Sequence, residues 1–95
     1  MTGLFIPASG TYGNKNVSTV VIAATAGSNH ASRSMLLVTP IDGDLYWGFD
    51  NSVTIANGTL ITATETAKFL FNPLVDVDIY IIAESGTVDT RFVEA

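Results

Sequence analysis

The chain has 95 residues, a length that is typical of one domain with a sizeable hydrophobic core. Its net charge is −5, and its four lysines and arginines are scattered along the chain. Because phosphate binding needs a cluster of basic side chains, this distribution argues against binding of nucleic acid or of an anionic membrane. The absence of cysteine excludes a disulfide framework and thiolate metal sites.

Charged residues make up only 14% of the chain, whereas hydrophobic residues make up 47%. Thr, Ser, Asn and Gly replace charge on the surface, and they lose less hydration energy on burial than charged groups do. This composition favours a surface that packs against a partner; the alternative is an ordinary β-sandwich with a Thr/Ser surface. Residues 1–7 carry no basic segment and no long apolar run, so we expect no signal peptide, no membrane-spanning segment and synthesis in a cytoplasm.

The N-terminal quarter begins with a short apolar segment. Leu4, Phe5 and Ile6 precede a proline, which confines them to an edge strand or to an arm that extends from the domain. The composition of residues 8–16 predicts a loop. The β-branched residues of segment 17–25 predict a strand.

The middle of the chain alternates strand-like segments with turn residues. Residues 34–39 form an apolar strand that ends before a proline, and an Asp-Gly turn separates it from a second strand at residues 45–49. Segments 52–55 and 59–62 flank an Asn-Gly pair, which predicts a type I′ hairpin. Residues 65–71 are ambiguous between one helical turn and a strand, and their threonines favour the strand.

The aromatic residues of the predicted strand at 45–49 fall on two faces. Trp47 lies on one face with a leucine and Phe49, a pattern that is typical of side chains in the core. Tyr46 falls on the opposite face, and Tyr80 does the same in a later strand. These two tyrosines are therefore the better candidates for contact with a ligand or with another protein.

The last twenty residues predict a hairpin of two strands. Asp76 and Asp78 alternate with apolar residues, which indicates one solvated face and one buried face. The turn is expected at residues 84–86, where Gly86 can adopt the positive φ that a tight turn needs. Residues 81–83 are apolar on both faces, so we expect the hairpin to be covered on both sides near its tip.

These segments together predict about eight short strands and no crossover helix. We therefore expect a single all-β domain over residues 1–95, an antiparallel β-sandwich that is jelly-roll-like. Residues 1–12 are a candidate N-terminal arm.

Catalytic and metal-binding patterns are weak in this chain. His30, the only histidine, lies in a predicted polar loop at residues 26–30, and no Gly-x-Ser-x-Gly motif accompanies it. The Asp-x-Asp pairs at 42–44 and 76–78 lack the rest of a calcium loop. We therefore expect no catalytic residues, no metal and no cofactor. The exposed aromatic residues leave open a module that binds carbohydrate.

Several strand and turn patterns resemble those of a known class of proteins. An Arg-Ser-aliphatic strand at 33–38 is followed by Leu-Tyr-Trp-Gly-Phe at 45–49, by Asn-Ser-Val-Thr at 51–54 and by the C-terminal pattern at 79–94. Over about residues 31–94, this arrangement resembles small β-sandwich virion proteins of tailed bacteriophages, especially head decoration (cement) proteins. The shared patterns are those of strands and turns, so they specify the fold better than the role.

The resemblance implies a virion structural protein on the capsid surface, without enzymatic activity. Such proteins bind the assembled shell of the major capsid protein, often as homotrimers, and an N-terminal arm commonly makes the contact. Leu4, Phe5 and Ile6 would then belong to the arm, and Tyr46 and Tyr80 to a capsid or subunit interface. Nucleic acid and membranes are not expected partners. The alternative is a carbohydrate- or receptor-binding module of a phage tail or fibre.

Overall fold

The computed structural model describes residues 10–26, 33–72 and 77–95. None of these segments contains a helix that is long and apolar enough to cross a membrane. The described residues form eight strands: β1 (Thr11–Val17), β2 (Ile22–Ala23), β3 (Met35–Pro40), β4 (Leu45–Gly48), β5 (Thr59–Ile61), β6 (Ala67–Leu70), β7 (Tyr80–Ala83) and β8 (Val88–Glu94).

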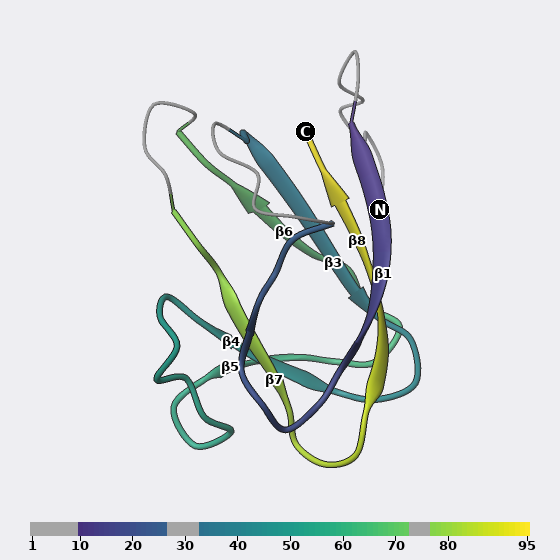
Figure 1. Ribbon diagram of the computed structural model, residues 1–95, viewed down its shortest axis with the longest axis vertical. Helices are drawn as coiled ribbons and strands as arrows, with labels where there is room; N and C mark the ends of the chain where they lie inside the picture. The colour runs from purple at the N-terminus through teal and green to yellow at the C-terminus, as the bar shows by residue number, and fades with distance from the viewer. Residues whose placement is uncertain (1–9, 27–32, 73–76) are drawn as a thin grey trace.

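The strands form two antiparallel sheets that pack against each other (Figure 1). The first sheet has the order β1-β8-β3-β6, and the second has the order β2-β7-β4-β5. Consecutive strands lie in different sheets in every case except β4 and β5, so the chain crosses between the sheets six times. This order is that of an eight-stranded jelly roll, and it confirms the predicted all-β antiparallel sandwich.

Alternate residues of both sheets meet in the core. Leu36 and Phe92 contribute from the first sheet, and Leu45, Ile61 and Ile81 contribute from the second, all of them buried. Burial of each such side chain stabilises the fold by roughly 1.5–3 kcal/mol. The period-two pattern of the sequence therefore has the expected cause, because one face of every long strand packs inward.

The predicted C-terminal hairpin is wrong, although its two strands and its turn exist. β7 pairs with β2 and β4, whereas β8 pairs with β1 and β3 in the other sheet. The turn therefore crosses from one sheet to the other, and Gly86 adopts the expected positive φ of 60° there. Local turn chemistry shows where a chain reverses, but the core decides which strands become neighbours.

The predicted Asn-Gly hairpin is also wrong. Residues 52–55 form no strand, and β5 pairs with β4. A type I′ turn needs positive φ at both central residues, and among the described residues only Thr64 and Gly86 have positive φ. The Asn57 side chain instead accepts a hydrogen bond from the Thr54 amide at 2.7 Å, and so it shapes a longer loop.

Strand boundaries in the N-terminal part differ from the prediction. β1 occupies much of the segment that was predicted to be a loop at 8–16, because its asparagines face outward on an edge strand that β8 supports. The strand predicted at 17–25 is reduced to β2, because the chain changes sheets after Val17. The strands predicted at 34–39 and 65–71 are confirmed as β3 and β6.

Parts of the predicted N-terminal arm and loops lie outside the described residues. Leu4, Phe5 and Ile6 are among them, and so are His30 and Asp76. The arm was predicted to reach residue 12, but its last two residues are the first two residues of β1.

Candidate functional site

The outer face of the second sheet carries a row of apolar side chains. Tyr46 of β4 lies opposite Leu60 of β5 and Ile82 of β7, and Tyr80 lies opposite Ala23 of β2. These five residues alternate with the buried ones, so they point away from the core. No residue of β2, β4, β5 or β7 is charged. We call Ala23, Tyr46, Leu60, Tyr80 and Ile82 the uncharged face.

Tyr46 and Tyr80 thus lie where the sequence predicted, away from the core and on neighbouring strands. Both side chains are half-buried, and Leu60 is 49% exposed. The loop after β4 accounts for part of this cover. Its buried Val53 packs so closely over Gly48 that a Cβ atom built there would lie 2.8 Å from the valine side chain.

The outer face of the first sheet is different in character. Lys68 of β6 lies there, and Arg91 of β8 pairs with Asp89 at 3.0 Å. Its exposed apolar side chains include Tyr12, which is 85% exposed. Among the described strands, charged residues therefore occur only in the first sheet.

The aromatic residues of β4 are only partly core residues. Trp47 packs against the core and makes edge-to-face contact with Phe69 of β6, with 4.9 Å between ring centroids. Phe49 was predicted to be buried beside it, but its side chain is 74% exposed because the strand ends at Gly48. It remains in edge-to-face contact with Trp47 at 5.2 Å. An aromatic group thus continues from the core to the surface.

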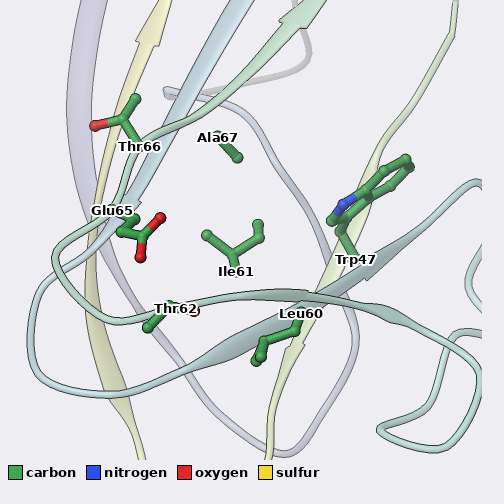
Figure 2. Close-up of a pocket in the computed structure, with 7 residues that line it drawn as sticks. All are labelled: Trp47, Leu60, Ile61, Thr62, Glu65, Thr66 and Ala67. Atoms are coloured by element: carbon green, nitrogen blue, oxygen red, sulfur yellow. The ribbon is translucent and has the colours of Figure 1, made fainter. Parts of the chain in front are cut away.

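A pocket of about 200 Å³ lies beside Trp47, between the edge strands β5 and β6 (Figure 2). Ile61 and Ala67 form its apolar centre, and the turn between the two strands forms the opposite wall. Figure 2 shows the carboxylate of Glu65 pointing inward from this turn, and the indole nitrogen of Trp47 facing the pocket from the other side. The sequence alone does not predict this pocket, because its two walls come from different strands that turn toward each other only in the folded sandwich.

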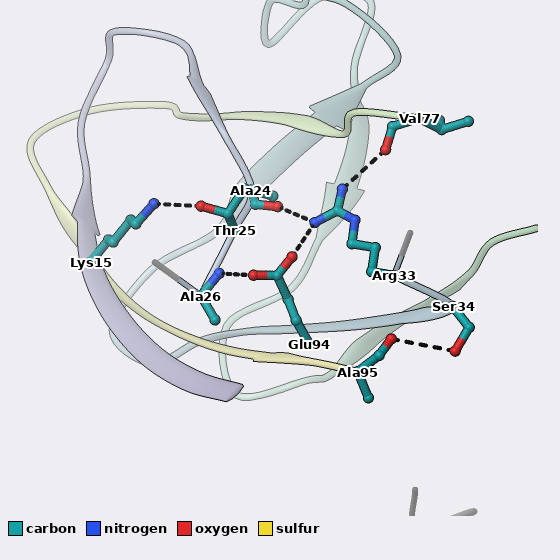
Figure 3. A network of polar contacts seen from close by, with 9 residues as sticks. All are labelled: Lys15, Ala24, Thr25, Ala26, Arg33, Ser34, Val77, Glu94 and Ala95. Carbon is teal, nitrogen blue, oxygen red and sulfur yellow. Dashed lines mark hydrogen bonds and ion pairs between the residues drawn. The ribbon is translucent and has the colours of Figure 1, made fainter. Parts of the chain in front are cut away.

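A second feature that sequence analysis missed is a buried ion pair (Figure 3). Arg33 Nη1 lies 2.7 Å from Glu94 Oε2, and the two side chains are only 5% and 1% exposed. The other Glu94 oxygen accepts a hydrogen bond from the Ala26 amide. Arg33 also donates to the carbonyls of Ala24 and Val77, at 2.8 and 3.2 Å. Its guanidinium lies over the ring of a partly buried phenylalanine.

This network joins Arg33 and the nearby segment after β2 to two distant segments, the residues before β7 and the end of β8. Both ends of the buried pair are satisfied by hydrogen bonds, so neither charge is left for chemistry in the described part of the chain. It holds the end of β8 against the residues that follow β2 and those that precede β7. We therefore interpret Arg33 and Glu94 as a structural pair.

The aspartates of the 42–44 turn act as backbone acceptors. Asp42 accepts a hydrogen bond from the Asp89 amide, and Asp44 accepts one from the Ala63 amide, both at 2.8 Å. The first bond joins the turn to β8, and the second joins it to the connection between β5 and β6. Within the described ranges, no group of three or more His, Cys, Asp or Glu residues could hold a metal ion.

No family model, curated protein or solved structure matches the chain. The resemblance to phage decoration proteins therefore rests on sequence patterns alone.

Proposed function

We propose that the protein is a non-enzymatic structural protein of a bacteriophage virion, which decorates the capsid surface and stabilises the assembled shell. The observation that carries the proposal is the uncharged face. A row of tyrosine, leucine and isoleucine side chains without a charged neighbour in any of its four strands loses little hydration energy when another protein covers it.

The uncharged face would supply the contact with a second copy of the chain or with the major capsid protein. Tyr46 and Tyr80 combine a large apolar ring with a hydroxyl that can bond at the rim of an interface. A homotrimer would present three such faces at a three-fold position of the shell. Because three weak contacts then form together, the trimer would bind far more tightly than one copy.

The experiment compares substitutions of the three tyrosines of the chain. Two lie on the uncharged face, and Tyr12 lies on the first sheet and serves as the control. Mass photometry measures the oligomeric state, and co-sedimentation measures binding to shells assembled from the major capsid protein of the same phage. Tyr46→Lys and Tyr80→Lys place a charge on the uncharged face. We expect each to weaken shell binding at least about tenfold, equivalent to about 1.4 kcal/mol.

The matched control is Tyr12→Lys, which places the same charge on the outer face of the first sheet. It should leave binding unchanged, and circular dichroism should show that all three variants fold. A monomer that binds no shell would contradict the proposal. So would equal losses of binding in the Tyr12 and Tyr46 variants.

A further inference from the structure

The pocket between β5 and β6 contains two polar groups without a hydrogen-bond partner among the described residues. These are the Glu65 carboxylate and the indole N–H of Trp47, which face the pocket from opposite sides (Figure 2). One can only accept a hydrogen bond when it is ionised, and the other can only donate. A ligand that satisfies both must therefore carry an acceptor and a donor a short distance apart.

A second depression, of about 280 Å³, provides a contrast. It is lined by residues of the loop after β4, but its polar groups are used within that loop. Asp50 accepts from the amide and hydroxyl of Ser52, and the Asn57 side chain bonds Thr54 and Ser52. These groups shape a turn. The groups of the Trp47 pocket have no such role in the described part of the chain.

The backbone that presents Glu65 is unusual. Thr64 precedes it with a φ of 69°, a left-handed conformation that is rare for a β-branched residue. The Thr64 amide donates to the carbonyl of Pro40 at 2.7 Å, and the Glu65 amide donates to that of Thr62 at 3.0 Å. These two bonds hold the strained turn in place at the wall of the pocket.

The walls of the pocket are apolar and aromatic. Ile61 and Ala67 offer a small apolar surface, and Trp47 forms the aromatic wall. Phe49 lies outside the pocket: its ring is 74% exposed, contacts the Trp47 ring edge-to-face and lines the second depression. A pocket with an aromatic wall, an apolar centre and two polar groups suits a ligand whose surface alternates between C–H groups and hydroxyl groups.

We propose that this pocket binds one unit of a neutral glycan. A pyranose ring has an apolar face for Trp47 and Ile61, a hydroxyl oxygen that can accept from the indole, and a hydroxyl that can donate to Glu65. An ammonium or guanidinium group could bind Glu65 but offers no acceptor to the indole N–H. An acidic sugar would be repelled by Glu65 and by the net charge of −5. This site does not depend on the uncharged face or on the proposed role in the capsid.

The single tryptophan makes the test direct, because all tryptophan fluorescence of the chain comes from the proposed site. A glycan array that contains neutral and acidic oligosaccharides selects the probe, and fluorescence titration with that probe measures the affinity. One ring in a pocket of this size should bind with a dissociation constant on the order of 1 mM. We expect neutral glycans to shift the emission and acidic glycans to leave it unchanged.

One variant tests the assigned contact of Glu65. Glu65→Gln should weaken binding about tenfold without changing the melting temperature by more than a few degrees, because the side chain is exposed. Glu84→Gln and Tyr12→Ala are matched controls outside the pocket and should bind as the unmodified protein does. The proposal is overturned if no neutral glycan shifts the emission, or if Glu65→Gln binds normally. Binding that is lost only in Tyr46→Ala would overturn it as well, because it would place the glycan on the uncharged face.

Discussion

The side chains of Arg33 and Glu94 bring two opposite charges into the interior of the jelly roll, 2.7 Å apart. Removal of both charges from water costs several kcal/mol for each ion, and the pair recovers this cost through its mutual attraction and its hydrogen bonds. The pair therefore stabilises the fold little more than two well-packed apolar residues would, but the loss of either partner leaves a buried charge uncompensated. Loss of one partner therefore costs more stability in this buried pair than in an exposed pair.

Arg33→Met should destabilise the protein by about 3–5 kcal/mol, because it leaves the Glu94 carboxylate buried without its partner. The double variant Arg33→Met/Glu94→Leu should be more stable than the sum of the two single losses predicts. Urea unfolding measures all four members of the cycle. Additive losses would contradict the coupling. Substitution of the exposed pair, Arg91→Met, should cost about 1 kcal/mol or less.

Thr64→Gly should stabilise the fold by about 1 kcal/mol, because glycine adopts a φ of 69° without the clash that a Cβ atom causes. For a chain of this size, the melting temperature would rise by about 4–8 °C. Thr66→Gly is the control, since its φ is not positive, and it should lower the melting temperature. If both variants lower it to the same extent, Thr64 is not strained.

Asp50 is a further case in which neighbours set the behaviour of one side chain. The hydroxyl of Ser52 and then its amide donate to the carboxylate, and they lower the pKa of Asp50 below its usual value of 3.8. A lowered folded-state pKa stabilises the fold above the pKa of the unfolded chain. This contribution is lost as the pH falls through the folded-state value. The ionised carboxylate thus helps to hold the loop after β4.

At the scale of the elements, the edge strands are short or carry polar residues. β2 has two residues and β5 has three, and β6 carries Lys68. Short and charged edges resist pairing with other chains, so association is more favourable through the faces of the sheets. β1 is the long edge strand. The backbone at Ala26 packs closely against it and fixes its position.

Gly13 is the residue of β1 at which this close packing occurs. A Cβ atom there would lie 2.0 Å from the Ala26 carbonyl oxygen, so Gly13→Ala must displace the segment that also binds Glu94. We expect a loss of about 3 kcal/mol, measured by urea unfolding. Gly86→Ala is the matched control, because its Cβ would meet no atom within 4 Å and only its φ of 60° is unfavourable. It should cost about 1–2 kcal/mol, and equal losses would contradict the steric argument.

At the scale of the whole molecule, the jelly roll joins strands that are distant in the sequence. Of the six strand pairs, only β4–β5 links consecutive strands. Each of the other pairs requires closure of a long loop before its contacts form, and such topologies fold slowly. We expect refolding on the millisecond-to-second timescale in stopped-flow fluorescence of Trp47. Refolding within microseconds would show that local contacts dominate.

The distribution of charge is also a property of the whole molecule. The first sheet presents Lys68, Arg91 and Asp89 to the solvent, and the strands of the second sheet present no charge. The two proposed sites also occupy different parts of the molecule. The uncharged face would pack against protein, whereas the Trp47 pocket lies on the edge between β5 and β6 and would remain open to a glycan.

The sequence by itself determined the all-β class, most of the strands and the outward direction of Tyr46 and Tyr80, because these depend on a period of two and on turn residues. Only the tertiary structure decided that β7 and β8 lie in different sheets, since the turn at Gly86 has the same chemistry in either arrangement. It also decided the pairing of Arg33 with Glu94, which are 61 residues apart, and the meeting of Trp47 with Glu65 at one pocket. Such contacts have no local signal, because they form only when the packing of the core brings distant strands together.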